Sequence, residues 1–566
     1  MKAMPFIQPN DSSGYTALNF SPRFWLLVVI TGIGAGLGAS LLMALLAVVQ
    51  HWSYSYSSGD FQHAAELVSP WRHVWIMAVA GLLATVVIWL LKHYWPGKDS
   101  DAPKAIWFRS GRLPFIRTII DAALSMTIVG MGASLGREGA PKQVGAAVAS
   151  VLSGWAKLEP AERRFLVACG AGAGMGAVYN VPLGGALFAL EVLLGTLALP
   201  LILPALTASF VATGVSWLTL PNHATYLVPN YTLTVGQLVW ALAFGPLAGV
   251  VSVLFVRLII LADAKKPQRG WTLMMPVLMF TLLGCFAIPF PQLLGNGKDV
   301  TQLTFTNQLS LPLLLAMIFL KPLATSGCLG SGAPGGLFTP SITIGAVLGG
   351  FFGRLWSFFW PGATPGSYAV IGAGAVLAAT TQAPVSSIVL LLELTHHTLD
   401  IFVPILVAVA GAAITARLLD RRSLYSGPVN TIRPAIIMPL NKIQISYKAR
   451  IHQNIEVISI STNYRAIMER FLDSNHAPKI LYVMDEKGIF VGRILLPAVI
   501  ACHPLARVLD TGAAADVVTP VNCLLPQMTQ ADVQRQLYRE PTGEVPVIDA
   551  LGGHLLGVVR RNLYIG

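Results

Sequence analysis

Apolar residues form long runs through the first three quarters of the chain. Residues 24–49, 165–194 and 238–261 are examples, and each run is longer than the roughly 20 apolar residues that a helix needs to cross the hydrocarbon core of a membrane. Further runs cover residues 74–91, 197–220, 311–323 and 401–418. The pattern therefore predicts an all-α polytopic membrane protein over residues 24–425.

The pattern changes after residue 425. Residues 426–443 contain three prolines and indicate a linker. Short strand-like runs at 455–460, 480–484 and 490–495 then alternate with a helical pattern at 464–475. A second set follows, with strand-like runs at 517–521, 544–549 and 554–559 and a helical pattern at 530–538. This order predicts two soluble α/β units, at residues 444–510 and 511–566.

The two halves of the membrane region repeat each other. GASLGREGAPKQVGA (132–146) aligns with GAPGGLFTPSITIGA (332–346), so that Gly136 matches Gly336 at a constant offset (332 − 132 = 200). YNVPLGGALFALE (179–191) aligns in the same order with TQAPVSSIVLLLE (381–393), so that Pro182 matches Pro384 (384 − 182 = 202). Repeats with Gly- and Pro-interrupted apolar segments are typical of transporters, whose ion sites lie between the repeats near the membrane midplane. We place the halves at about residues 24–225 and 232–425.

The GREGA segment (136–140) places Arg137 and Glu138 between glycines inside this apolar region. An ionised carboxylate is costly at membrane depth, so Glu138 needs either a partner or a function. The glycines let backbone amides approach a ligand, and Pro141 can open a helix whose free amides and dipole favour an anion. The matching segment GGLFTP (335–340) has Phe338 where Glu138 stands. Two hypotheses follow: Glu138 gates an anion site between two helix starts, or it forms a structural ion pair with Arg137.

The composition predicts how the protein is oriented in the membrane. Of the 566 residues, 54% are hydrophobic and 11% are charged, and the formal net charge is +12. In a membrane protein, an excess of Lys and Arg predicts basic cytoplasmic loops and a cytoplasmic tail. No dense basic run with interleaved aromatic residues is present, so nucleic acid is not an expected partner. The five cysteines lack metal-ligand spacing, and we expect core residues and no metal site.

Four segments together resemble the CLC family of chloride channels and chloride/proton antiporters: GREGA-x-x-x-x-G, GAPGGLFTPSITIGA, YNVPLGGALFALEV and SLYS (423–426). The tail resembles a pair of CBS domains. The resemblance implies a homodimer with one chloride pore per subunit, each subunit an inverted repeat of tilted, broken helices. It also implies a multi-pass transport protein, not an enzyme, in the cell (inner) membrane. Residues 1–23, the C-terminus and the CBS tail would be cytoplasmic, and the partners would be chloride, the lipid bilayer and a second copy of the chain.

The same resemblance assigns roles to individual residues. Glu138 matches the family's gating glutamate. Tyr425 matches the tyrosine whose hydroxyl meets the central chloride, with an interfacial tyrosine as the alternative. Four further positions match backbone amides that coordinate the anion: Arg137, Gly139, Leu337 and Phe338.

Two positions depart from the family pattern. Ser100, in KDSDAP (98–103), occupies the slot of the central anion-binding serine, but Asp99 and Asp101 flank it where the family has glycines. Two acids beside an anion path would repel the anion, so the loop either turns them away or has lost the site. Proton-coupled members usually carry a second acid directly after FALE, as a proton relay, whereas Val192 stands here.

Valine cannot carry a proton, so Val192 favours a voltage- or pH-gated channel for chloride and similar small monovalent anions. A chloride/proton antiporter that uses Glu138 and a water path is the alternative. A non-conducting membrane sensor, in which the CBS pair reports on a ligand, is a third hypothesis.

Several other polar groups need an account. We expect Glu191 and its repeat mate Glu393 to tie helix ends to neighbouring backbone amides. Lys321 is expected either to add positive potential inside the membrane or to extend to its surface. The CBS endings GRILLP (492–497) and GVVRRN (557–562) lack the hydroxyl and acid that hold a ribose in that family. No cofactor is therefore expected, and an adenine nucleotide in the tail is the weaker hypothesis beside a structural role.

Overall fold

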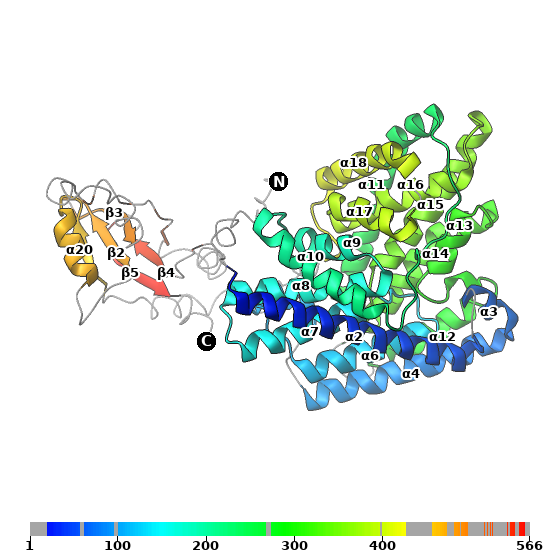
Figure 1. The fold of residues 1–566 in the computed structure, drawn as a ribbon, viewed down its shortest axis with the longest axis horizontal. Helices are drawn as coiled ribbons and strands as arrows, with labels where there is room; N and C mark the ends of the chain where they lie inside the picture. Colours follow the sequence, from blue (N-terminus) through cyan, green and yellow to red (C-terminus); the bar gives the residue numbers. More distant parts are fainter. Residues whose placement is uncertain are drawn as a thin grey trace, which may run out of the picture. The chain divides into compact units, whose positions relative to one another are not determined.

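The computed structural model describes most of the chain. The described residues are 20–56, 61–95, 100–267, 273–396, 399–425, 455–472, 480–486, 488–495, 544–548 and 554–560, with single positions at 514, 518, 521, 523, 524 and 540. The chain divides into two compact units, Met1–Thr431 and Ile432–Gly566. The first is helical and the second is an α/β unit (Figure 1).

Helices make up nearly all of the first unit, as its apolar runs predict. Within the described residues, seven are long and apolar enough to cross a membrane: α2 (Pro22–Tyr54), α4 (Pro70–Tyr94), α10 (Leu199–Ser216), α11 (Val235–Ala264), α14 (Leu311–Gly330), α15 (Phe338–Phe359) and α18 (Phe402–Leu419). The others are α3 (Phe61–Leu67), α5 (Ala102–Phe108), α6 (Phe115–Gly130), α7 (Gly139–Trp155), α8 (Pro160–Tyr179), α9 (Pro182–Leu187), η1 (Phe188–Leu194), α12 (Met275–Phe286), η3 (Pro291–Leu293), α13 (Lys298–Phe305), α16 (Pro365–Thr381), α17 (Pro384–Thr395) and η4 (Leu399–Ile401).

The internal repeat is visible in how the helices pack. In the first half α7 packs along α8 and α10 along α2, and in the second half α15 packs along α16 and α18 along α11 (Figure 1). A Cβ atom on Gly145 of α7 would overlap the carbonyl of Gly170 in α8, and Gly345 of α15 meets Gly372 of α16 in the same way. Such small residues let membrane helices approach closely. The chain therefore builds one arrangement twice, which confirms the predicted repeat.

The apolar run at residues 165–194 does not form one span. α8 ends at Tyr179, Asn180 adopts a left-handed conformation with φ 56°, and Pro182 then opens α9. The second half has the same break, because Gln382 has φ 60° and Pro384 opens α17. A proline in the first turn starts a helix but cannot extend a preceding one. Each break creates a new helix N-terminus that is partly buried.

The acids at the ends of these segments fasten the two halves to each other. Glu191 of η1 accepts hydrogen bonds from the amides of Val385 and Ser386 at the start of α17, at 3.3 and 2.6 Å. Its mate Glu393, in α17, accepts from the amides of Leu183 and Gly184 at the start of α9, at 3.0 and 2.6 Å. Each carboxylate thus satisfies the free amides of the opposite helix N-terminus. The prediction that these acids tie helix ends to backbone amides is confirmed.

Removing either acid should cost stability. We expect Glu191→Ala and Glu393→Ala each to lower the free energy of unfolding by about 2 kcal/mol, because each leaves two backbone amides without a charged acceptor. Thermal unfolding of the protein in detergent measures this, with the two variants compared directly. A large loss for one variant and none for the other would contradict the equivalence of the two contacts.

Two expectations about buried groups need correction. Lys321 of α14 is fully buried, and its Nζ donates to the carbonyls of Leu293 and Gly295, both at 3.0 Å. The expectation that it extends to the membrane surface is therefore wrong. Among the cysteines, Cys169 and Cys328 are buried as expected, but Cys285 is exposed on α12. Apolar surface is compatible with lipid, so a membrane helix can present such a residue outward.

The second unit shows the order expected for a CBS domain. Its first sheet runs β1 (Val457–Ser459), β2 (Ile480–Met484), β3 (Phe490–Leu495), with α20 (Tyr464–Leu472) between β1 and β2. β1 pairs parallel to β2, with Val457 opposite Tyr482, and β2 pairs antiparallel to β3. A crossover helix is what a parallel pair requires. A second sheet pairs β4 (Glu544–Ile548) with β5 (Leu555–Arg560) in antiparallel fashion.

The two sheets of this unit are joined by polar contacts. Arg493, in the GRILLP segment, forms an ion pair with Glu540 at 2.5 Å, and both side chains are about nine-tenths buried. Tyr482 also donates to Glu544 at 3.3 Å. Arg493 is thus committed to a structural contact. The helical pattern predicted at 530–538 and Arg561 of GVVRRN lie outside the described residues.

Candidate anion site at two helix N-termini

The loops that precede α7 and α15 meet at matching glycines. The amide of Gly136 donates to the carbonyl of Gly336 and the amide of Gly336 donates to the carbonyl of Gly136, each at 2.8 Å. Both loops begin with a glycine at positive φ, Gly132 at 110° and Gly332 at 98°, where other residues would be strained. An antiparallel contact between equivalent residues is what an inverted repeat predicts at its axis.

This contact brings the first turns of α7 and α15 together. Gly139 is the first residue of α7, and a Cβ atom on it would lie 2.8 Å from the amide nitrogen of Gly336. Leu337 is the N-cap of α15 and Phe338 its first residue. Within the described residues, the amides of Gly139 and Ala140 make no backbone hydrogen bond. Two helix N-termini therefore present free donors and positive dipole ends to one region.

Glu138 fills the space between them. It is the N-cap of α7 and is 1% exposed. Its Oε1 accepts a hydrogen bond from the amide of Phe338 at 2.6 Å. Its Oε2 accepts from the hydroxyls of Thr339 at 3.0 Å and Tyr179 at 3.1 Å. The carboxylate thus lies where the N-terminus of α15 would hold a free anion.

Two glycines make room for this carboxylate. A Cβ atom on Gly136 or on Gly336 would overlap the carboxyl group of Glu138. For Gly136 all three nearest atoms belong to that group, so the contact involves no backbone. Any side chain at this position must therefore displace the carboxylate.

Arg137 is not the partner of Glu138. Its guanidinium lies over the ring of Tyr179, 4.9 Å from the centroid, and within the described residues its Nε is buried without a hydrogen-bond partner. A cation over an aromatic face is a favourable contact. No ion pair joins Arg137 and Glu138 in the described part of the chain, so the structural ion-pair hypothesis is wrong.

Tyr425 lies beside the first turn of α7. Its ring packs edge-on against Phe188 with centroids 5.3 Å apart, and the Nζ of Lys142 lies 4.6 Å from its centroid. Its hydroxyl is buried and has no hydrogen-bond partner among the described residues. A buried phenol needs a partner, so this donor is available to a ligand.

Ser100 is used differently from the expectation. Its side chain is buried, and its hydroxyl donates to Oδ2 of Asp121 in α6. Because a hydroxyl has only one proton to donate, Ser100 cannot give that proton to an anion as well. Asp101 is the residue before α5, and its carboxylate forms an ion pair with Lys104 at 3.7 Å. Asp99 lies outside the described residues.

Val192 is partly buried and packs against the core within η1, a π-helix. The carboxylate of Glu191, beside it, accepts hydrogen bonds from Val385 and Ser386 at the start of α17. Residues Tyr179, Thr339 and Lys142 have no counterpart in the sequence-based site. Only Lys142 gave a signal, as a cation in the first turn of a helix beginning in an apolar segment.

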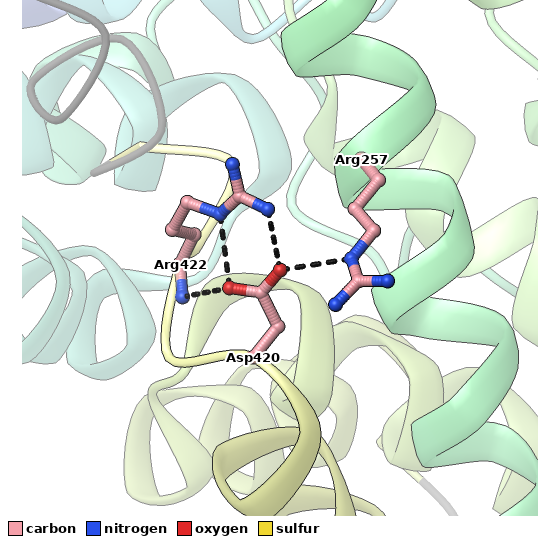
Figure 2. Close-up of polar contacts among 3 residues, drawn as sticks. All are labelled: Arg257, Asp420 and Arg422. Atoms are coloured by element: carbon pink, nitrogen blue, oxygen red, sulfur yellow. Dashed lines mark hydrogen bonds and ion pairs between the residues drawn. The ribbon is translucent and has the colours of Figure 1, made fainter. Parts of the chain in front are cut away.

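An ion cluster fixes the chain just before Tyr425 (Figure 2). Asp420 follows α18 and accepts from Arg422, with Nε at 2.9 Å and Nη2 at 2.6 Å, and from Nε of Arg257 in α11 at 2.9 Å. The amide of Leu424 then donates to the carbonyl of Thr380 at 2.9 Å. These contacts hold the segment that leads to Tyr425.

Asp420→Asn should weaken this anchor. Hydrogen bonds from Arg422, and then those from Arg257, hold the pKa of Asp420 well below its usual range. A lowered carboxyl pKa adds stability that is complete above the unfolded value of about 3.9 and is lost only as pH falls through the folded value. We expect the variant to lose about 1 kcal/mol of stability, measured by thermal unfolding. Between pH 5 and 8 the shape of its flux–pH curve should match wild type, and a changed shape would contradict this.

Comparisons with known proteins agree with this geometry. A family model described as voltage gated chloride channel matches residues 84–417. The chain is 30% identical over 415 residues to a protein of Citrobacter koseri named voltage-gated ClC-type chloride channel ClcB, covering 71% of this chain and 98% of the relative. It is 29% identical over 417 residues to the protein of that name in Salmonella typhimurium, with the same two shares.

Solved structures show the same fold. The structure of a slow cyanobacterial Cl⁻/H⁺ antiporter has a TM-score of 0.64 at 23% identity and covers 72% of this chain and 98% of its own. That of a eukaryotic CLC transporter has a TM-score of 0.61 at 19% identity and covers 95% and 97%. The chain is therefore a membrane transport protein that belongs to the voltage-gated chloride channel (CLC) family.

Proposed function

We propose that this protein is a gated chloride channel, with one pore in each subunit of a homodimer and the carboxylate of Glu138 as its gate. The observation that carries the proposal is the hydrogen bond from the Phe338 amide to Glu138 Oε1 at 2.6 Å. In this position the carboxylate competes with a permeant anion for the same donors. Protonation, or rotation of the side chain, releases the donors to chloride. Uncharged amides bind an anion weakly enough for it to leave again, as conduction requires.

The channel mode is favoured by the absence of an acid at residue 192. Val192 offers no group to carry a proton, and Glu191 is engaged by the amides of Val385 and Ser386. The relatives named above as channels are consistent with this mode.

A chloride/proton antiporter is the second candidate. Glu138 shares hydrogen bonds with Tyr179 and Thr339, whose hydroxyls lie 2.6 Å from each other. Such linked hydroxyls give a proton a first step away from the carboxylate. The cyanobacterial protein of the same fold is named as an antiporter.

Paired flux measurements separate the candidates. The purified full chain is placed in vesicles with an outward chloride gradient, and chloride efflux and external pH are recorded together. The channel predicts chloride efflux without proton movement. Uphill proton movement driven by the chloride gradient would assign the antiporter instead. Vesicles that retain their chloride would reject both and leave the non-conducting sensor.

The orientation proposed for the protein follows its basic residues. α4 and α11 end at a common cavity of about 260 Å³ lined by Lys92 and Lys266. Arg417 lies in the last turn of α18. Because cytoplasmic loops carry an excess of Lys and Arg, we place these ends, both termini and the CBS tail in the cytoplasm, with the protein in the cell (inner) membrane.

A further inference from the structure

Lys142 is a buried cation close to the anion site, and the proposed function gives it no role. It lies in the first turn of α7, four residues after Glu138, and is 8% exposed. Its Nζ takes part in no hydrogen bond or ion pair within the described residues. It makes a cation–π contact with the ring of Tyr425, 4.6 Å from the centroid. Burial without a partner is costly for an ammonium group.

The position of Lys142 in its helix adds to this cost. The N-terminus of a helix carries partial positive charge, so a cation in its first turn is repelled. An anion beside the ammonium would offset both the burial and the dipole. Nearby carboxylates supply only part of that charge. Asp101 is paired with Lys104, and Glu138 is bound at the start of α15.

The hydrogen-bond donors around Tyr425 outnumber the acceptors that the described residues offer them. The Tyr425 hydroxyl, with one O–H donor, is buried and has no hydrogen-bonding partner in the described part of the structure. The ammonium of Lys142 has three N–H donors, and it lies over the ring of Tyr425. Ser100, the expected donor, donates its hydrogen bond to Asp121. A small anion beside Tyr425 is the ligand that would use the free donors.

We propose that Lys142 is an anion ligand of the pore, which with the Tyr425 hydroxyl forms the inner binding position and replaces Ser100 in that role. This inference rests on the proposed function, because it assumes that chloride passes between Glu138 and Tyr425. A charged donor forms shorter and stronger hydrogen bonds to an anion than a neutral hydroxyl does. The pore therefore holds its anion more tightly and releases it more slowly than a pore with neutral donors alone. Chloride, bromide and nitrate are the class of ligand that fits.

Chloride titration of the purified full chain by calorimetry tests this inference. We expect Lys142→Met to raise the chloride dissociation constant at least tenfold, and Lys142→Arg, which keeps the charge, to restore most of the affinity. Ser100→Ala should leave the dissociation constant unchanged. Lys157→Met is the matched control, because Lys157 is an exposed lysine just beyond the other end of α7.

The outcomes separate this inference from the proposed function. Wild-type affinity in Lys142→Met would overturn the role of Lys142. Loss of binding in Ser100→Ala would overturn it as well, whether or not the Lys142 variants fold. A wild-type protein that binds no chloride would reject the proposed function itself. Size-exclusion elution and thermal unfolding of each variant show that the comparison is made between folded proteins.

Discussion

Glu138→Gln is expected to raise chloride flux about tenfold or more at neutral pH and to remove most of its dependence on pH. The glutamine side chain has the same shape as the protonated acid but carries no charge. A hydrogen bond to a charged acceptor is worth about 1.5 kcal/mol more than one to a neutral acceptor, and 1.4 kcal/mol is a factor of ten in an equilibrium. The closed position at Phe338 is therefore less populated in the variant. Chloride efflux from vesicles at several pH values measures both effects.

Glu162→Gln is the control for this experiment, since Glu162 lies in the same half and caps the start of its own helix, α8. It should behave as wild type. A Glu138→Gln protein with wild-type flux and wild-type pH dependence would count against the gate.

Gly136→Ala should also open the pore, although it leaves Glu138 in place. Its added Cβ would occupy the space of the Glu138 carboxyl group, and the nearest atoms all belong to that flexible side chain. The carboxylate must then leave the Phe338 amide, and its donors become available to chloride. We expect a flux increase comparable to that of Glu138→Gln, about tenfold. The double variant Gly136→Ala with Glu138→Gln should show no further increase, because both changes remove the same plug.

Gly154→Ala is the matched control for the alanine. Gly154 lies near the end of α7, the helix that follows Gly136, and its added Cβ would meet nothing within 4 Å. Wild-type flux in Gly136→Ala, or a double variant whose increase is the product of the two single effects, would contradict a shared plug.

The broad fold was predictable from the sequence because it depends on repeated patterns. The apolar runs predicted the membrane helices, and the aligned GREGA and GGLFTP segments predicted two equivalent helix starts. The strand-like runs at 480–484 and 490–495 predicted β2 and β3 with their observed bounds. Such patterns depend on local conformation and on burial, so they can be recognised without knowing which residues meet in the folded protein.

The contacts within the site were less predictable, because they depend on which side chains meet across the repeat. Nothing local to Tyr179 or Thr339 indicates that their hydroxyls reach Glu138. The neighbour Arg137 is adjacent in sequence to Glu138, yet its guanidinium lies over Tyr179. Ser100 was placed by resemblance alone, and Asp121, which accepts its hydrogen bond, lies 21 positions away. The break at Asn180 was missed because the residues on both sides of it are equally apolar.

The reciprocal contacts between the two halves explain how the backbone donors of the site are kept in position. Gly136 and Gly336 fix the two loops at the repeat axis, while Glu191 and Glu393 fasten α17 and α9 to the opposite half. The contact between the glycines joins two backbone segments, so side-chain rotation cannot break it. The other two contacts join a carboxylate to backbone amides. These contacts preorganise the donors at the starts of α7 and α15, and in the proposed gate only the side chain of Glu138 has to move.

Anomalous diffraction from crystals of Glu138→Gln in bromide tests the position of the anion most directly. We predict a bromide ion within hydrogen-bonding distance of the Phe338 amide, at the place that the wild-type carboxylate occupies. Bromide found only at sites remote from α7 and α15, or a wild-type Glu138 side chain directed at lipid, would contradict a pore plugged at this point.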